Sequence, residues 1–158
     1  MEKIIVGIAE GKTAGHGQVL VSYALGSCVG VCLYDVKNKI AAMAHIILPD
    51  KHYSINQENV YKFAIEGTHE LVHKICRKGA QKRYLVAKIA GGAKMFSTAE
   101  QSLNIGEANV KNVKKALREE GIRLVAEDIG GSHGRTITFR AEDGILEVST
   151  VRQAVIYL

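Results

Sequence analysis

The sequence contains no tryptophan, one proline and three cysteines in 158 residues, and its apolar runs are short. None of these runs approaches the ~20 residues that a membrane-spanning helix needs, and no secretory signal pattern opens the chain. An odd number of cysteines without paired metal-binding spacing indicates free thiols in a reducing compartment. We therefore expect a cytoplasmic protein with neither a disulfide framework nor a metal cluster.

Charge is not concentrated anywhere in the chain. The formal net charge is +5 and the isoelectric point is near 9.1. Lysines and arginines are spread over the predicted helices and the two ends, without a dense basic tract or interleaved aromatic residues. This pattern favours solvated helix faces, and an acidic protein partner fits the charge as well as nucleic acid does. We expect no nucleic-acid partner.

Apolar periodicity predicts more strands than helices. Alternating patterns predict strands over residues 3–9, 18–25, 28–35, 40–48, 83–90, 122–129, 135–141 and 145–151. Helical spacing predicts helices over 56–78 and from Asn104 to Gly121, and residues 11–17 are predicted to be a loop. Because most strands follow one another as hairpins, we expect a single α+β domain over residues 1–158. It would be layered, with a largely antiparallel sheet and two covering helices.

The most informative stretch is the strand that begins at Cys28, after a predicted Gly26-Ser27 turn. Its alternation predicts one aliphatic face for the core and a second face of small and reactive residues. The second face carries Cys28, Gly30, Cys32 and Tyr34. A reactive face next to a core is unusual and indicates a site.

A two-residue loop at Lys37-Asn38 sets the predicted register of this hairpin. In that register Gly30 lies opposite His45, and Cys28 and Cys32 lie on its two diagonals, roughly 7–8 Å away between backbones. Because Gly30 has no side chain, the imidazole is expected to lean over it. A slip of one residue would place His45 on the opposite face from both thiols.

A thiol beside an imidazole predicts a nucleophile and its base. Geometry alone leaves both cysteines open, and a free cysteine in a strand is often only a small apolar residue. The position of Cys28 beside a turn favours it as the nucleophile, whereas Cys32 is assigned to packing. A histidine base also needs a group that orients its ring. Ser22, on the neighbouring predicted strand, is the candidate, although it could equally bond locally.

Two further features need an interpretation. The glycines of the loop from Gly91 to Phe96 indicate a close backbone approach. Lys94 and Phe96 are candidate partner-binding residues, and the alternative is that Phe96 is core and Lys94 merely solvated. His69 and His73 are spaced i, i+4 on a predicted helix, but no third ligand is apparent, so we expect solvated histidines and no metal.

Several motifs, in this order along the chain, resemble those of the chemoreceptor glutamine deamidase family, CheD. They lie at residues 25–29 (LGSCV), 42–49 (AMAHIILP), 88–96 (KIAGGAKMF), 104–106 (NIG) and 126–131 (AEDIGG). The set spans most of the chain and is specific as a combination. The resemblance implies a fold like that of bacterial toxin deamidases, related to papain-type thiol hydrolases.

The resemblance implies hydrolysis of particular glutamine side chains on methyl-accepting chemotaxis receptors, giving glutamate and ammonia. Glutamyl methyl esters are a second substrate class to test. It implies Cys28 as the nucleophile and His45 as the base. In the mechanism that follows from these parts, the Cys28 N–H is a candidate oxyanion donor. Ser22 stands where the family typically has threonine, so the hydroxyl is kept and the methyl is lost. No metal or organic cofactor is implied.

The resemblance also implies a protein partner, a CheC-type phosphatase acting on phosphorylated CheY, and contact with the membrane only through receptors. Two alternatives stay open: a non-catalytic chemotaxis adaptor whose thiol is incidental, and a small-molecule amidase. The role of the loop from Gly130 to Arg135 also stays open, because Ser132 stands where the family usually has asparagine.

Overall fold

The computed structural model describes residues 1–95, 104–151 and 153–158. Its elements, in chain order, are β1 (Glu2–Ile5), β2 (Gly11–Ala14), β3 (Gln18–Leu25), β4 (Val29–Asp35), β5 (Ile40–Ile46), η1 (Lys51–Tyr53), η2 (Val60–Lys62), α1 (Ala64–Arg77), η3 (Lys82–Tyr84), β6 (Leu85–Gly91), α2 (Ile105–Glu119), β7 (Arg123–Ile129), β8 (Arg135–Arg140), β9 (Leu146–Ser149) and β10 (Ile156–Tyr157). No helix within these ranges is long and apolar enough to cross a membrane.

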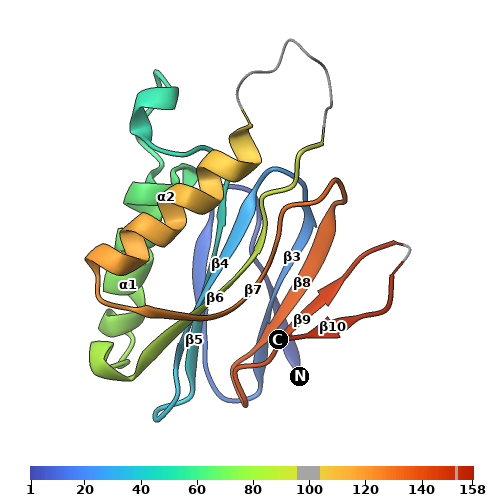
Figure 1. The fold of residues 1–158 in the computed structure, drawn as a ribbon. Helices are drawn as coiled ribbons and strands as arrows, with labels where there is room; N and C mark the ends of the chain where they lie inside the picture. Colours follow the sequence, from blue (N-terminus) through green and yellow to red (C-terminus); the bar gives the residue numbers. More distant parts are fainter. Residues whose placement is uncertain (96–103, 152) are drawn as a thin grey trace.

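The strands form two five-stranded sheets, in the orders β1-β3-β8-β9-β10 and β2-β5-β4-β6-β7. Figure 1 shows α1 and α2 on one side of the second sheet and the first sheet on its other side. Within the described ranges, only the β1–β3 and β6–β7 pairs are parallel, and the remaining pairs are antiparallel. The predicted α+β class, with two covering helices and mostly antiparallel strands, is confirmed.

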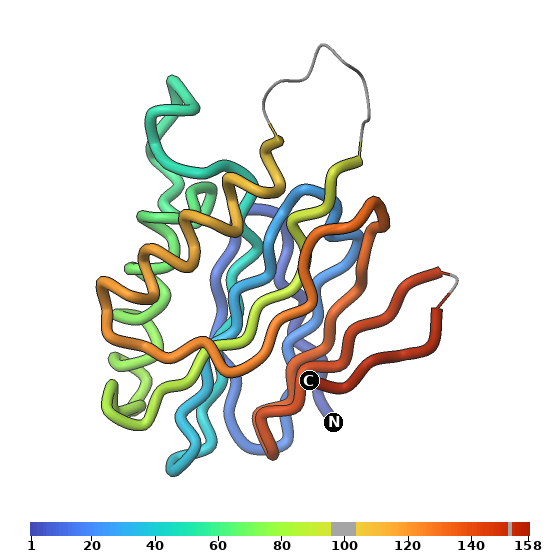
Figure 2. Tube along the Cα trace, viewed as in Figure 1, coloured from blue at the N-terminus to red at the C-terminus, as the bar shows by residue number. Residues whose placement is uncertain are grey.

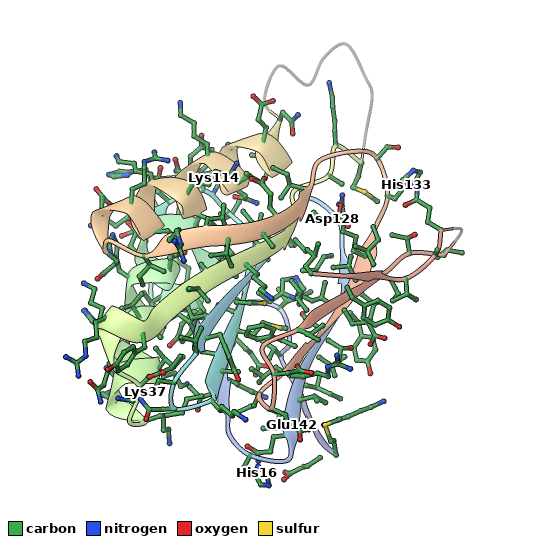
Figure 3. The ribbon with its side chains drawn as sticks, turned by 60° about the horizontal axis from the view of Figure 1, so that its bottom comes forward. His16, Lys37, Lys114, Asp128, His133 and Glu142 are labelled. Carbon is green, nitrogen blue, oxygen red and sulfur yellow. The ribbon has the colours of Figure 1, made fainter. Side chains whose placement is uncertain are left out.

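Two apolar layers hold these parts together. One lies between the helices and the second sheet, β2-β5-β4-β6-β7, which is the central layer, and it contains residues such as Val31, Ala44 and Leu71. The other lies between the two sheets and takes residues such as Leu20, Met43 and Phe139. Figure 3 shows side chains filling the space between the sheets, with His16 and Glu142 at one end and Asp128 and His133 at the other. Burial of these apolar surfaces is the main favourable term in folding.

The β4–β5 hairpin has the predicted register, with Gly30 opposite His45. Its loop differs from the prediction, because the last pair is Asp35 with Ile40 and four residues form the turn. The carboxylate of Asp35 accepts the N–H groups of Lys37 and Asn38 at 2.9 and 2.8 Å. This side chain replaces the last backbone pair and leaves the register unchanged.

Two local predictions were wrong. The predicted loop over 11–17 contains β2, which pairs with β5 as an edge strand. The first long helix begins at Ala64 and not at Asn56, because residues 56–59 are irregular and η2 precedes it.

Strand β3 carries a bulge between Ser22 and Leu25, so Leu25 turns into the core while Tyr23 is 51% exposed. A bulge of this kind shifts the alternation by one residue.

Candidate active site

Cys28 lies in the short connection between β3 and β4, directly before Val29. Figure 2 traces how this connection, the end of β5 and the loop after β6 reach the same end of the molecule. The Gly92 N–H donates to the Cys28 carbonyl at 2.8 Å, and the Ala93 N–H donates to Gly26 at 2.9 Å. A Cβ atom on Gly91 would lie 2.2 Å from the Cys28 oxygen. The predicted close approach of the glycine loop is therefore made to the Cys28 segment.

His45, near the end of β5, is held from the opposite sheet. Its Nδ1 lies 2.8 Å from the Oγ of Ser22 in β3, and both side chains are almost completely buried. Sequence reasoning placed Ser22 on a neighbouring strand. In the structure β3 pairs with β1 and β8, so the contact crosses the space between the sheets.

The hydrogen bonds of Ser22 fix the tautomer of His45. The single hydroxyl proton of Ser22 is donated to the Val6 carbonyl, 2.8 Å away, because a carbonyl only accepts. The Ser22 oxygen must then accept from His45, so Nδ1 carries the proton. The other ring nitrogen, Nε2, is buried and has no hydrogen-bond partner within the described residues. Neutral His45 therefore presents a free lone pair at Nε2.

The Val6 carbonyl is a part of the site that sequence reasoning missed. It is a backbone group on the segment after β1. This segment is bonded to β5, because the Ala9 N–H donates to the His45 carbonyl at 2.9 Å and the His45 N–H donates to the Glu10 backbone carbonyl at 3.0 Å. Ala9 has a φ of 58°, a backbone conformation that is uncommon for a residue with a Cβ. No residue type in this segment signals such a role, because a carbonyl is common to all residues.

Burial shifts both candidate groups toward their neutral forms. Desolvation raises the pKa of the Cys28 thiol, and the hydrogen bond from its own backbone N–H opposes that rise. Desolvation also lowers the pKa of His45. In the resting protein we therefore expect a neutral thiol and a neutral imidazole, which together can exchange one proton.

Cys32 occupies a different environment from Cys28. It lies within β4 opposite both Met43 and Lys88, is 0% exposed, and burial strongly raises its pKa. Cys28, in contrast, is only partly buried. The observed ladder places Cys32 on a diagonal of His45, whereas Cys28 lies just beyond the last ladder pair and, of these two thiols, is the one with surface exposure.

Gly30 serves a different purpose from the one predicted. A Cβ atom at this position would lie 2.3 Å from Cδ1 of Ile137 and 3.2 Å from Cδ1 of Leu25. The nearest atoms above Gly30 therefore come from the opposite sheet, and not from His45. The glycine lets the two sheets pack closely beside the site.

Buried Arg135 connects the two glycine loops at this end of the molecule. Its guanidinium donates to the Gly130 carbonyl at 2.9 Å and to the Gly91 carbonyl at 3.4 Å, and it lies 3.5 Å from Asp128. The Gly130 N–H also donates to Gly91 at 3.0 Å. The loop whose role the sequence left open thus supports the loop that contacts Cys28.

The predicted partner-binding residues are only partly described. Lys94 is exposed, and its backbone N–H donates to the Gly131 carbonyl at 2.9 Å. Phe96 lies outside the described residues. The neighbouring Met95 is 45% exposed, so this loop presents both a cation and an apolar side chain to solvent.

His69 is not the solvated helix histidine that was predicted. Its ring nitrogens lie 2.6 Å from Glu120 and 3.0 Å from Glu119, at the end of the other helix. Burial lowers its pKa, but the hydrogen bonds and charges of both carboxylates outweigh that effect and raise it. His73 lies 3.8 Å from Glu70 on its own helix. Within the described residues, no group of three or more potential metal ligands is found.

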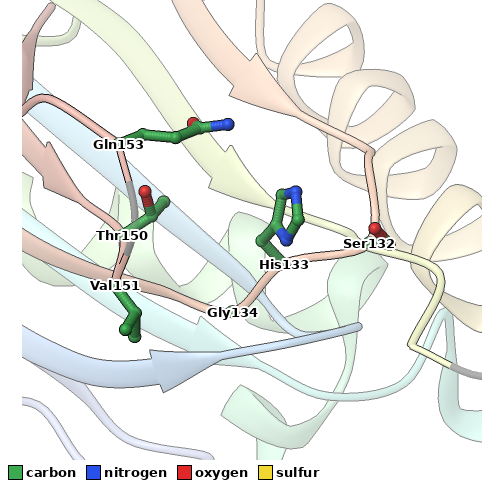
Figure 4. A pocket seen from close by; sticks show the side chains of 6 residues that line it. All are labelled: Ser132, His133, Gly134, Thr150, Val151 and Gln153. Atoms are coloured by element: carbon green, nitrogen blue, oxygen red, sulfur yellow. The ribbon is translucent and has the colours of Figure 1, made fainter.

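A groove of about 410 Å³ lies on the surface beside the Gly130–Arg135 loop. Figure 4 shows the residues that line it, which are Ser132, His133, Gly134, Thr150, Val151 and Gln153. A neighbouring groove of about 470 Å³ shares Gly134, Thr150 and Val151 with it. Neither is lined by Cys28, His45 or Ser22.

The fold and the site define a three-layer α+β protein with a buried serine–histidine pair, in which a free thiol directly precedes the strand that pairs with the histidine strand. A sequence model of the family described as CheD chemotactic sensory transduction matches residues 47–150. The chain belongs to the CheD family, as its motifs indicated.

Curated relatives match the chain over nearly its whole length. A probable chemoreceptor glutamine deamidase CheD of Clostridium novyi is 44% identical over 98% of this chain and 96% of its own length. The corresponding protein of Caldanaerobacter subterraneus is 43% identical over 97% and 96%. The chemoreceptor glutamine deamidase CheD of Halalkalibacterium halodurans is 46% identical over 94% and 93%.

One solved structure is similar to this chain at a low level. The crystal structure of the hypothetical protein YfiH of Bacillus licheniformis superposes with a TM-score of 0.47 and 14% identity, over 75% of this chain and 49% of that one. A similarity at this level assigns no function.

Proposed function

We propose that the protein hydrolyses specific glutamine side chains of chemotaxis receptors to glutamate and ammonia, with Cys28 as the nucleophile. The observation that carries the proposal is His45 Nε2, which has no hydrogen-bond partner in the described part of the chain and is held in the basic tautomer by Ser22 and the Val6 carbonyl. Family membership and the names of the curated relatives support the substrate class.

The first half of the reaction forms a thioester. His45 Nε2 takes the proton of Cys28, and the sulfur attacks the carboxamide carbon of the substrate. The resulting imidazolium donates that proton to the departing nitrogen, so ammonia leaves as the C–N bond breaks. Ser22 accepts from Nδ1 throughout and stabilises the charged ring.

The second half restores the enzyme. His45 takes a proton from water, the hydroxide attacks the thioester carbon, and the C–S bond breaks. The proton returns to the sulfur, and a glutamate side chain leaves. The balance is one amide and one water in, and one acid and one ammonia out, so the steps require no metal or organic cofactor. A glutamyl methyl ester would follow the same path, with methanol as the leaving group.

The N–H of Cys28 is the proposed donor to the developing oxyanion. The carbonyls around Cys28 already accept hydrogen bonds. Those of Gly26 and Cys28 accept from backbone N–H groups of the loop after β6, and that of Ser27 accepts from a side chain of α2. The Cys28 N–H makes no backbone hydrogen bond to any described residue, and its contact is with its own sulfur. It is therefore free to turn to a substrate oxygen bound beside the thiol.

The receptor and a CheC-type phosphatase are proposed to share the surface around Lys94. A protein substrate has to reach a thiol that lies between loops. The exposed residues Lys94 and Met95 belong to the loop after β6, at the end of the molecule that carries Cys28. If the surface is shared, the phosphatase inhibits deamidation, and Phe96→Ala, at a position outside the described residues, weakens phosphatase binding. Calorimetric titration with and without a receptor fragment tests this, and simultaneous binding of both proteins would refute a shared surface.

The test of the function is intact-mass spectrometry of receptor cytoplasmic fragments after incubation with the protein. We expect the mass gain of glutamine-to-glutamate conversion and matching release of ammonia, both lost with Cys28→Ala. The competing adaptor function predicts binding to receptor or phosphatase with no mass change. Free glutamine as a substrate distinguishes a small-molecule amidase.

A further inference from the structure

Asn109 joins the two segments that carry the nucleophile and the base. It lies near the start of α2 and is 0% exposed. Its Nδ2 donates to the Ser27 carbonyl at 3.0 Å and to the Ile47 carbonyl at 3.1 Å. Ser27 directly precedes Cys28, and Ile47 follows His45 by two residues. One buried amide therefore bridges the two segments.

The bridge lies where the hairpin ladder has stopped. The last pair of β4 and β5 at this end is Val29 with Ile46. Beyond it the strands separate, and the Ile47 N–H donates to the Lys62 carbonyl at 3.1 Å. No ladder pair of the described residues holds the Cys28 segment to the end of β5, so Asn109 supplies the connection that the backbone no longer makes.

Helix α2 is fixed well enough to act as a support. Asn104 caps it by accepting the Glu107 N–H at 3.0 Å. A Cβ atom on Gly106 would lie 2.4 Å from the Ala93 oxygen and 2.5 Å from the Gly92 oxygen. The first turn therefore packs directly on the loop that also bonds the Cys28 segment, and only glycine permits this contact.

The Asn109 amide is costly as a purely structural element. Its Oδ1 is buried and has no hydrogen-bond partner within the described residues. A buried polar atom left unpaired destabilises the folded state, and an apolar residue here would in turn leave the Ser27 and Ile47 carbonyls without this donor. The amide therefore acts through its two hydrogen bonds, which tie these two segments together, and not through apolar packing.

We propose that Asn109 is a positioning residue, which holds the Cys28 thiol in line with Nε2 of His45 by tying Ser27 to Ile47. The proposal deepens the function proposed above and rests on it. Misplacement of reacting groups by about 1 Å can cost on the order of 10²-fold in rate. A positioning residue should affect the chemical step more than substrate binding.

Asn112 provides a matched control on the same helix. Its Nδ2 donates to the Pro49 carbonyl at 3.1 Å, and Pro49 lies further from His45 along the chain. We would compare Asn109→Leu with Asn112→Leu on a glutamine-containing receptor fragment. For Asn109→Leu we expect kcat to fall on the order of 10²-fold with KM changed less than ~threefold. For Asn112→Leu we expect both constants within about twofold of wild type.

Iodoacetamide labelling of Cys28 across pH gives a second readout that needs no receptor. We expect Asn109→Leu to slow labelling at neutral pH and to shift its pH dependence, with Asn112→Leu unchanged. If Asn109→Leu does not fold, Asn109→Ser carries the same test, because the shorter hydroxyl adds no bulk and cannot reach both carbonyls.

Wild-type kcat in the folded Asn109 variant would overturn the proposal. So would equal losses in the Asn109 and Asn112 variants that follow their melting temperatures. A failure of the proposed function looks different, because the wild-type protein would then not deamidate the receptor fragment, or Cys28→Ala would still do so. In either case the labelling comparison would continue to report whether Asn109 positions the thiol.

Discussion

The two apolar layers of the molecule differ in what else they contain. The layer between the helices and the central sheet is aliphatic, and the buried polar residues of the two helices beside it are Thr68 of α1 and Asn109 of α2. The layer between the two sheets includes Ser22 and His45, both almost completely buried. Strands from two sheets present side chains directly to each other, so a hydroxyl and an imidazole from distant parts of the chain can meet there.

The central hairpin serves both layers through its alternation. Val31 and Leu33 point to the helices, whereas Cys32 and Tyr34 point to the other sheet. The comparison teaches that the helix side of the hairpin stabilises the fold, while its sheet side, at one end, holds the residues of the proposed active site. Apart from Asn109, which bonds the Cys28 and His45 segments from α2, changes on the two sides should therefore separate stability from activity.

The largest expected effect is that of Cys28→Ala, which should lower deamidation by on the order of 10³-fold or more, because it removes the nucleophile. Its melting temperature should stay close to that of wild type, since Cys28 is only partly buried. Cys32→Ala should keep most activity and lose about 1 kcal/mol of stability, because it trims a fully buried side chain. Ammonia release and thermal melts check both. The reverse pattern would reassign the nucleophile to Cys32.

His45→Ala should lower turnover by roughly 10²–10⁴-fold, since it removes the proton carrier. It should also slow iodoacetamide labelling of Cys28, which in wild type should be faster than labelling of Cys32 and Cys76. Peptide mass spectrometry at neutral pH measures this directly. Equal labelling of all three thiols, before and after the substitution, would count against an activated pair.

Ser22→Ala should be milder, with turnover lower by on the order of tenfold, as for the loss of partners that orient histidines in metal sites. It removes the acceptor at Nδ1 and the donor to the Val6 carbonyl. Ser22→Thr should be tolerated, because it keeps the hydroxyl and restricts its rotamers. Steady-state kinetics of both variants decide the point, and unchanged turnover in Ser22→Ala would remove Ser22 from the site.

The smallest effect is expected on the helix side, at His69. Its pKa is raised in the folded protein, so its pairing with Glu119 and Glu120 stabilises the fold fully below the ordinary pKa of 6.5. That contribution is lost as the pH rises through the folded pKa. His69→Gln should therefore lower the melting temperature more at low pH than at high pH, without changing deamidation. A constant difference across pH, or a loss of activity, would contradict the separation of the two sides.

The sequence by itself determined what depends on neighbours along the chain. The pairing of Gly30 with His45 follows from a short loop and from the alternation of the two strands. The predicted register is correct although the predicted loop is too short, because the Asp35 side chain closes the longer turn. The helix beginning at Asn104 follows from a local cap. The motifs that resemble the CheD family also read directly from the chain.

Only the tertiary structure decided which distant groups complete the site. Ser22 meets His45 across two sheets, and the Val6 carbonyl fixes the tautomer. The bulge that turns Leu25 inward, the packing of Ile137 over Gly30 and the bridge made by Asn109 all depend on contacts far apart in sequence. Spacing along the chain determines which face a side chain occupies within one element. It does not determine which element packs against that face, because that choice is made by packing of the whole domain.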